Sequence, residues 1–369
     1  MRGSFYKEIN IKIYLENGAV FGGNAFGYFK KGVELIGDIA VHTGITGYQE
    51  AISDPAYAGK LLCMTTPLIG SYGINLEDME SDKPHISALI VRHKSDYPNN
   101  WRCEMTLDGY LKQTRVLGIE EIDPRALTRI ARQEGAMKAL ISTEELTESQ
   151  VKEKINSHKA ENLVEKVTTK EKYVFEGKGI KSLHIGVLDL GVKNSLLKSL
   201  QRRGAKLTVF PASTSMDEIL SNNIDGVFIT GGPGSPDDID NVIQTVSELA
   251  QKKPIVGTGL GHLVLAKALG CTVERMKFGH HGGNYSVKSK ADGRAYITSQ
   301  GHDHVITKCS DDVVASYVNI NDGSIEGIRH RKLQASSVAW SITGSPGPDT
   351  DFVIDDFLRM IEDGRLFYA

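Results

Sequence analysis

Short runs of consecutive apolar residues alternate with amphipathic segments over the second half of the chain. Strands that are apolar throughout are buried on both faces, and the amphipathic segments supply the helical crossovers that parallel strands require. The pattern therefore predicts an α/β domain at 181–369 with a doubly wound, mainly parallel sheet. The expected strands are 183–188, 206–210, 226–230 and 254–256, and the expected helices are 193–200, 216–220, 242–251 and one that includes 263–269.

The first part of the chain has shorter alternating segments separated by glycine. Segment 11–15 alternates apolar and polar residues, Asn17-Gly18 is typical of a hairpin turn, and 19–21 returns as a second strand. These features predict a strand-rich α/β domain at 1–143. Segment 144–180 is highly charged, contains one amphipathic helix near 148–158, and offers little that could fill a core. We therefore expect it to be a linker between two separately cored domains.

Composition narrows the range of partners and compartments. The chain has 369 residues, of which 40% are hydrophobic and 24% charged, with a formal net charge of -3. This length can bury two cores, and this charge gives no electrostatic reason to bind nucleic acid or an anionic membrane. No apolar run approaches a membrane span and the first residues lack the apolar core of a signal peptide, so we expect a cytoplasmic protein. The cysteines are widely spaced without a CxxC pair, so neither a disulfide framework nor a cysteine zinc site is indicated.

The segment 254–270 has the pattern of a catalytic turn. A short apolar strand ends near Val256, a tight GTGLG turn follows at 257–261, and an apolar helix continues the chain. A strand, turn and helix in this order form a nucleophile elbow, which projects one side chain over the positive end of a helix at the carboxyl edge of a sheet. The residue at the apex is Gly259, which has no side chain.

Three short sequence motifs resemble those of a known family. GTGLGH at the elbow, ITGGPGSP before it and FGHHGGN after it resemble class I glutamine amidotransferases, and most of the chain resembles the small, glutaminase-type subunit of carbamoyl phosphate synthetase. In that family a cysteine at the Gly259 position attacks the glutamine carboxamide. The resemblance also implies that backbone N–H groups of Gly232 or Gly234 and of Leu260 stabilise the negative oxygen of the intermediate.

The resemblance also locates the acid–base partners of that cysteine. In relatives a His-Pro-Glu motif lies shortly before Ser-Pro-Gly-Pro. Its histidine accepts the cysteine proton and its glutamate orients the histidine. A register without gaps puts Ser341 at the histidine position and Thr343 at the glutamate position. All three members of the triad are therefore replaced, and we expect this chain not to hydrolyse glutamine.

Positions that hold glutamine in relatives are altered as well. Leu263 stands where a glutamine side chain holds the substrate, and Gly301 stands where an asparagine does. Asp303 and His304 replace a glycine and an aromatic residue of the same motif. Gly44 occupies a position in the N-terminal domain that in relatives lies against bound glutamine. Each missing partner of a buried polar substrate weakens binding by about ten- to a hundredfold.

Two other sources of chemistry are less favoured by the sequence. Cys271 follows the elbow helix and is expected to face the core, which makes it a poor substitute nucleophile. A histidine-dense region has residue types that can bind a metal. Most of its residues match family motifs that hold no metal in relatives, so we expect no metal site. That region comprises His280, His281, His302, Asp303 and His304.

Three functions remain open. The favoured one is a catalytically silent small subunit whose N-terminal domain docks a large synthetase subunit, which would use free ammonia for pyrimidine or arginine biosynthesis. Because nothing here resembles a phosphate-binding P-loop, we expect ATP, magnesium and bicarbonate on that partner and no cofactor on this chain. The second is a pseudoenzyme that binds or regulates another small molecule or protein. The third is new hydrolytic chemistry near His302 and His304.

Overall fold

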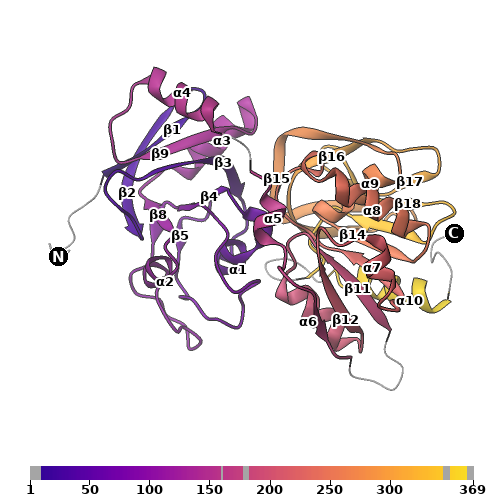
Figure 1. Ribbon diagram of the computed structural model, residues 1–369. Coiled ribbons are helices and arrows are strands. Elements are labelled where there is room, and N and C mark those ends of the chain that lie inside the picture. Colours follow the sequence, from indigo (N-terminus) through magenta and orange to yellow (C-terminus); the bar gives the residue numbers. More distant parts are fainter. Residues whose placement is uncertain (1–9, 159–160, 178–182, 344–349, 364–369) are drawn as a thin grey trace. The chain divides into compact units, whose positions relative to one another are not determined.

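The computed structural model describes residues 10–158, 161–177, 183–343 and 350–363. Figure 1 labels its helices and strands. The chain divides into two units, one of Met1–Ser53 and Tyr57–Glu161 and the other of Asp54–Ala56 and Asn162–Ala369. Each unit contains its own buried hydrophobic clusters, as the length of the chain allows. Within the described ranges no helix combines the length and apolar character that crossing a membrane needs.

The first unit is built on a closed β-barrel, indigo to magenta in Figure 1. Its strands in spatial order are β1 (Asn10–Leu15), β2 (Val20–Gly27), β8 (Leu117–Glu120), β6 (Ala88–Ile90), β4 (Leu61–Met64), β3 (Glu34–His42) and β9 (Lys138–Ser142). A two-stranded sheet joins β5 (Leu68–Ile69) to β7 (His93–Lys94). The helices of this unit are α1 (Tyr48–Ser53), α2 (Leu107–Gln113), α3 (Pro124–Glu134) and α4 (Glu148–Ser157), whereas the residues of η1 (Pro55–Tyr57) are divided between the two units.

The hairpin expected at Asn17-Gly18 joins β1 to β2. Gly18 has a φ of 92°, which suits glycine, and the Asn17 side chain accepts a hydrogen bond of 3.0 Å from the Ala19 N–H. The Leu15 N–H donates to the Ala19 carbonyl at 2.8 Å and closes the turn. The sequence prediction of this hairpin is confirmed.

The second unit is built on a ten-stranded sheet, of which five neighbouring strands are parallel. These are β12 (Lys206–Pro211), β11 (His184–Asp189), β13 (Gly226–Ile229), β14 (Ile255–Thr258) and β19 (Ala335–Val338). β11, β13 and β14 are buried along almost their whole length, because helices cover both faces of the sheet. The predicted α/β fold with a doubly wound parallel sheet is confirmed.

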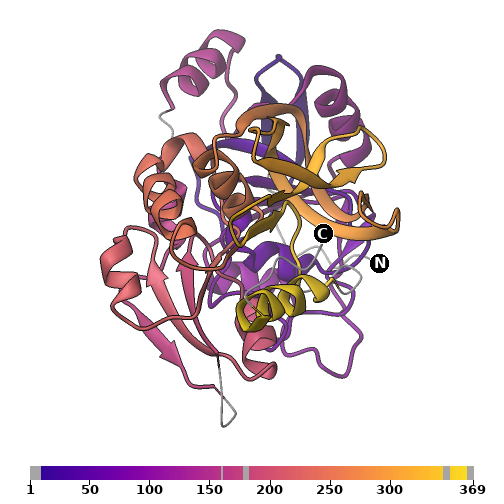
Figure 2. The ribbon, with the colours of Figure 1, turned by 90° about the vertical axis from the view of Figure 1, so that its right-hand side faces the viewer.

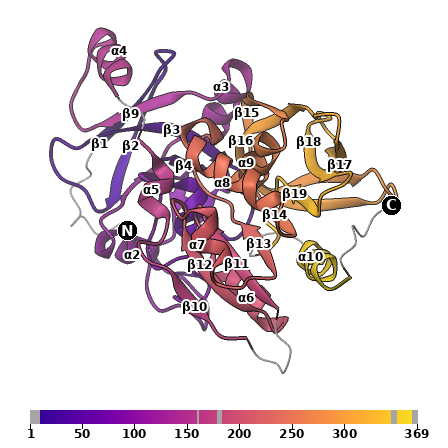
Figure 3. The ribbon, with the colours of Figure 1, turned by 45° about the vertical axis from the view of Figure 1, so that its right-hand side comes forward.

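Two helical layers enclose these parallel strands. One face carries α7 (Met216–Leu220), α8 (Asp240–Ala250) and α9 (Leu260–Ala268), whose apolar side chains form one core cluster. The other face carries α6 (Asn194–Arg202) and α10 (Phe352–Asp363), which share a second cluster. In Figure 3, α8 and α9 lie on one side of β14 and β19, and α10 lies on the other.

Four antiparallel strands extend the sheet beyond β19 and were not among the strands expected from the sequence. They are β18 (Ile325–His330), β16 (Ala295–Lys308), β15 (Thr272–Ser289) and β17 (Val313–Asn319). β15 and β16 form the long curved hairpin drawn in orange in Figure 2. Their pairing has register shifts between Arg275 and His280 and between Gly282 and Tyr285. Such bulges break the two-residue period by which a sequence pattern reveals a strand.

The charged segment 144–180 is not a free linker, because the two units share it. α4 packs on the first unit through Val151 and Ile155, which lie one helical turn apart. α5 (Leu163–Val167) buries Val164 in the core of the second unit, and β10 (Tyr173–Phe175) pairs with β12. The helix expected near 148–158 is confirmed, and the expected boundary near residue 180 lies outside the described residues.

Candidate functional site

The elbow has the backbone that its sequence pattern predicts. β14 ends at Thr258, α9 begins at Leu260, and Gly259 between them has φ 52° and ψ -119°. This left-handed conformation strains any residue with a Cβ atom. A Cβ atom added at Gly259 would lie 3.2 Å from the Gly231 Cα atom, so there is room for a small side chain at some cost. The turn is formed and its apex bears no side chain.

The glycine turn after β13 lies against the elbow. The Gly261 N–H donates to the Thr230 carbonyl at 3.1 Å and ties the two loops together. Gly232 admits no side chain, because a Cβ atom there would lie 2.0 Å from the Leu190 carbonyl oxygen. Gly234 has a φ of 85°, and the next residue caps the short helix η2 (Pro236–Asp238). Leu260 is the first residue of α9, so its N–H has no acceptor within the helix. The backbone features expected of an oxyanion hole are therefore in the chain's second unit, at one edge of one sheet.

Ser341 and Thr343 follow β19, the strand beside the elbow. Thr258 pairs with Val338, and the Gly259 N–H donates to the Val338 carbonyl at 3.1 Å. The Ser341 hydroxyl donates to the Thr343 carbonyl at 3.0 Å, and the Thr343 hydroxyl lies 3.0 Å from the Ser195 hydroxyl. Both side chains are thus engaged in local hydrogen bonds, and a hydroxyl is no base at neutral pH. The Ser-Pro-Gly-Pro word at 345–348 lies outside the described residues.

Leu263 points into an apolar cluster. It is 3% exposed and packs with Ile306 and Ile328, on β16 and β18. These strands meet α9 on the face of the sheet away from α10. The position at which the family resemblance predicts a substrate-holding glutamine is thus part of the hydrophobic core.

Asp303 and His304, which also differ from the residues that the resemblance predicts, each contact another side chain of the second unit. His304 Nε2 lies 3.2 Å from the hydroxyl of Ser235, which follows the glycine turn. His281 Nε2 donates to Asp303 Oδ1 at 2.9 Å, and in the β15–β16 ladder Gly301 pairs with His281. β16 is therefore tied by side chains both to the glycine turn and to β15. The sequence did not single out Ser235, although its place directly after GGPG was a usable signal.

Gly44 belongs to the first unit, in the turn after β3. Its N–H donates to His42 Nδ1 at 3.2 Å, and its carbonyl accepts from the Thr66 hydroxyl at 2.9 Å. A Cβ atom at this position would lie 2.5 Å from a ring atom of His42. A side chain at position 44 would therefore have to displace the His42 ring.

His262 is buried in α9, one turn from the elbow. Its Nδ1 atom lies 2.7 Å from the Ser337 hydroxyl of β19, and the side chain is fully buried. Burial lowers the pKa of His262 from 6.5 to about 3. The ring is therefore neutral at physiological pH and joins the elbow helix to the neighbouring strand.

The histidine-dense region resolves into a buried network centred on Glu326. His280 Nδ1 donates to Gln300 Oε1 at 2.7 Å, and His280 Nε2 donates to Asp322 Oδ2 at 2.9 Å. Gln300 Nε2 donates to Glu326 Oε2 at 3.1 Å, and His302 Nδ1 donates to the His304 carbonyl at 2.9 Å. Burial alone would raise the pKa of Glu326, but hydrogen bonds from the two histidines outweigh it and lower that pKa. We call these side chains the Glu326 network.

Potential ligand atoms of His280, His302 and Glu326 lie within 4.8 Å of one another. Each of these atoms already takes part in the hydrogen bonds or ion pairs of the Glu326 network. The sequence drew attention to the histidines and missed Glu326, because an isolated glutamate in a strand carries no motif. Only the pairing of β15, β16 and β18 brings it to them.

Cys271 lies in the core, as expected from the sequence. It is 7% exposed and packs in the cluster that contains Leu263. Burial raises the pKa of the neighbouring Cys309 thiol, and a hydrogen bond with Cys271 adds to that effect. The Cys309 thiol therefore resists ionisation, and such a thiol is a poor nucleophile.

Two family matches cover most of the chain. Residues 13–141 match "Carbamoyl-phosphate synthase small chain, CPSase domain", and residues 186–340 match "Glutamine amidotransferase class-I". A carbamoyl phosphate synthase small chain from Clostridium perfringens is 42% identical over 349 residues, covering 94% of this chain and 98% of the relative. The chain belongs to the carbamoyl phosphate synthase small-chain family. The amidotransferase match ends at Trp340, immediately before Ser341.

Other relatives are similar over nearly their whole length. The pyrimidine-specific carbamoyl phosphate synthase small chain of Bacillus subtilis is 38% identical over 354 residues, covering 95% of this chain and 96% of the relative. Among solved structures, a glutamine amidotransferase from Thermotoga maritima has a TM-score of 0.37 and 16% identity, covering 50% of this chain and 84% of that one.

Proposed function

We propose that this member of the small-chain family does not hydrolyse glutamine. The observation that carries the proposal is Gly259, which holds the elbow conformation and offers no atom to bond the carboxamide carbon. Ser341 and Thr343, at the positions of the acid–base partners, carry only hydroxyls. Loss of nucleophile and base together costs on the order of a millionfold in rate. The surviving backbone donors would then have no intermediate to stabilise.

Support for a lost substrate site comes from the side chains around the elbow. Leu263 is in the hydrophobic core and makes no hydrogen bond through its side chain. His304, at a position where the resemblance predicts an aromatic ring, contacts Ser235 directly after the glycine turn. Each such change removes a substrate partner or fills its space, so glutamine binding would be weak even with a nucleophile restored.

The proposed role is that of a structural or allosteric partner of a carbamoyl phosphate synthetase large subunit that uses free ammonia. This role is supported by the family and by the barrel, whose match to the small-chain domain spans residues 13–141. ATP, magnesium and bicarbonate would bind to the large subunit. A small chain without glutaminase activity would still contribute binding energy that favours one conformation of its partner.

The first test is glutamate release from glutamine by the purified chain, with the Clostridium perfringens relative as the active control. We expect no release above background. The single variant Gly259→Cys should also be inactive, because Ser341 cannot take the thiol proton. A fourfold variant with Gly259→Cys, Leu263→Gln, Ser341→His and Thr343→Glu tests whether the scaffold remains competent. Glutamate release by the unaltered chain at ordinary enzymatic rates would refute the proposal.

The second test is co-expression with the large synthetase subunit from the same source, followed by purification through a tag on this chain. We expect the large subunit to co-purify, and carbamoyl phosphate formation from free ammonia to rise when this chain is present. Formation that is unchanged by this chain, or recovery of a partner that is no synthetase, would instead favour the regulatory-module hypothesis.

A further inference from the structure

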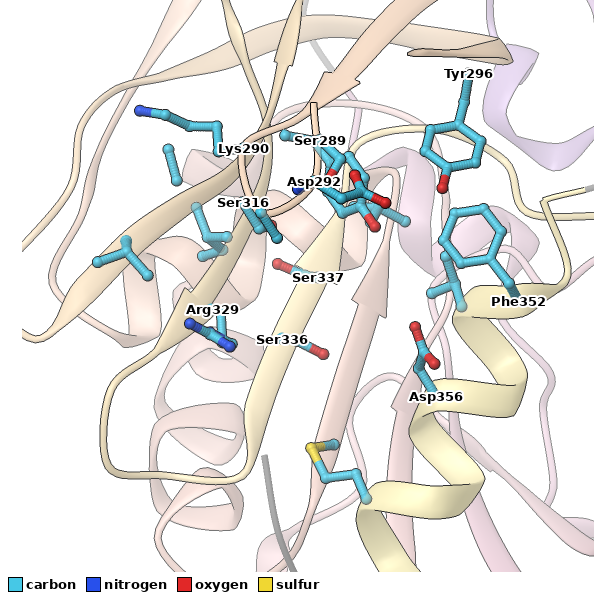
Figure 4. Close-up of a pocket in the computed structure, with 18 residues that line it drawn as sticks. Ser289, Lys290, Asp292, Tyr296, Ser316, Arg329, Ser336, Ser337, Phe352 and Asp356 are labelled. Atoms are coloured by element: carbon cyan, nitrogen blue, oxygen red, sulfur yellow. The ribbon is translucent and has the colours of Figure 1, made fainter. Parts of the chain in front are cut away.

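A cavity of about 530 Å³ lies in the second unit between the antiparallel strands and α10. β17, β18 and β19 form its floor, and α10 and the turn between β15 and β16 form its wall (Figure 4). This volume is in the range of small-molecule sites. The elbow helix α9 packs on the opposite face of these strands, where Leu263 meets Ile328. The cavity is therefore separate from the amidotransferase edge.

Arg329 lies on β18, the middle strand of the floor. It pairs with Val314 of β17 and with Ser336 of β19, so these three side chains form a row across three strands on the face toward α10. The Arg329 Nη1 atom is buried and has no hydrogen-bond partner in the described part of the chain. A buried donor without an acceptor is destabilising, and more so when it is charged.

The acids that line the cavity do not balance this charge. Asp292 forms its ion pair with Arg294 at 3.4 Å, and Asp356 lies 3.8 Å from Arg359. Neither makes an ion pair with Arg329 among the described residues. The guanidinium group thus provides a cationic point inside the cavity, with Ser336 as its neighbour on the adjoining strand.

The opposite wall is apolar and aromatic. The ring centroids of Tyr296 and Phe352 lie 5.0 Å apart, and Val338 and Met360 add further apolar surface to the lining. Figure 4 shows Arg329 and Ser336 on one side of the cavity and Tyr296 and Phe352 on the other. A ligand that fits both sides has an anionic end and an apolar body.

We propose that this cavity binds a small monocarboxylate with an apolar or aromatic body, its carboxylate on Arg329 and Ser336. Guanidinium and carboxylate groups form charge-assisted hydrogen bonds that would satisfy the buried Nη1 donor. A doubly charged phosphate ester fits less well, because the lining sets Lys290 and Arg329 against Asp292 and Asp356 and so has no excess positive charge for a second negative charge. The proposal holds whether or not the chain hydrolyses glutamine.

The test is titration calorimetry of the full chain with benzoate, phenyl phosphate and benzamide. Benzoate has the proposed charge and shape, phenyl phosphate carries the larger charge, and benzamide keeps the shape without charge. We expect benzoate to bind at least about tenfold more tightly than either of the others. Tighter binding of phenyl phosphate or equal binding of benzamide would overturn the carboxylate assignment.

Three variants decide whether the binding is at this cavity. Arg329→Gln should weaken benzoate binding by about tenfold or more, whereas Arg331→Gln, an exposed arginine two positions along, should change it by less than about twofold. Ser336→Leu fills the floor and leaves Arg329 in place, so it should also abolish most binding. Circular dichroism establishes that each variant is folded. Benzoate binding unaltered by both cavity variants, or none to the unaltered chain at tens of millimolar, would overturn the proposal.

Discussion

The elbow edge and the Glu326 network are two polar regions of the same sheet, and they differ in how far their side chains contribute to the stability of the fold. At the elbow the backbone turn is formed, and the positions that we propose for the reactive side chains hold Gly259, Ser341 and Thr343. In the network, every named histidine and carboxylate has a partner, and Glu326 is fully buried. The comparison teaches that the proposed loss of catalytic groups falls at a half-buried edge, whereas the buried charge of the core has kept its partners.

The physical reason lies in desolvation. A nucleophile or base at the edge of a sheet contributes to catalysis and little to folding, so its replacement leaves few groups unsatisfied. Glu326 accepts hydrogen bonds from Asn319 and Gln300 and pairs with buried histidines. Removal of one member leaves the others buried without partners, which costs several kcal/mol.

The largest expected effect is that of Glu326→Ala. It should lower the free energy of unfolding by about 3 to 5 kcal/mol, because charged and polar partners remain buried. The matched control at the elbow edge is Ser341→Ala, which removes one hydroxyl and should cost less than about 1 kcal/mol. Urea unfolding followed by circular dichroism measures both. Similar costs for the two variants would erase the contrast between the regions.

Leu263→Gln should come next, with a loss of about 2 to 3 kcal/mol. The amide would enter an apolar cluster beside Ile306 and Ile328, where it has no evident partner. Leu263→Met keeps the volume and the apolar character and should cost less than about 1.5 kcal/mol. Unfolding in urea separates the two. If the glutamine variant were as stable as the methionine variant, position 263 would still face an open polar site.

Gly259→Ala should lower the free energy of unfolding by about 1 to 3 kcal/mol through backbone strain alone. The residue has φ 52°, and the new Cβ atom would lie 3.2 Å from Gly231. Gly22→Ala in β2 is the control, since nothing lies within 4 Å of a Cβ atom there. Thermal unfolding of both variants should place Gly259→Ala clearly lower. Equal stability would mean that the elbow turn had relaxed away from the conformation of relatives.

The last prediction concerns pH, for which the expected change per pH unit is small. Burial by itself lowers the pKa of His280, but the hydrogen bond and charge of Glu326 outweigh it and raise that pKa above 6.5. The stability due to His280 is therefore complete below pH 6.5 and is lost as pH rises through its raised pKa. His262, with its pKa lowered to about 3, acts on the other side, because the unfolded chain takes up a proton below pH 6.5 that the buried ring does not.

We therefore expect the contributions of these two histidines to sum to a maximum near pH 6.5, with slopes of at most about 1.4 kcal/mol per pH unit for each group. Urea unfolding over a series of pH values gives the curve. The variant His280→Asn should flatten its alkaline side and His262→Asn its acid side. Identical curve shapes in all three proteins would contradict the assigned pKa directions.

Much of the fold could be predicted from local pattern. The parallel strands and their helices follow from apolar runs, the first hairpin from Asn17-Gly18, and the elbow from GTGLG. The long strands β15 and β16 could not be predicted in this way, because their bulges and mixed exposure erase the alternation. The packing of segment 144–180 could not be predicted either, because its few apolar residues, such as Val151 and Val164, lie among many charged ones.

The sequence by itself determined the family, the doubly wound sheet and the absence of a side chain at the apex of the elbow, because these depend on residue identity and short-range spacing. Only the tertiary structure decided which polar residues meet. It brought Glu326 to His280 and His302, placed Ser235 against His304, and left Arg329 facing a cavity beside Ser336. The contacts of Glu326 and of Ser235 join segments far apart in the chain, and the burial that gives such contacts their energy exists only once the sheet has formed.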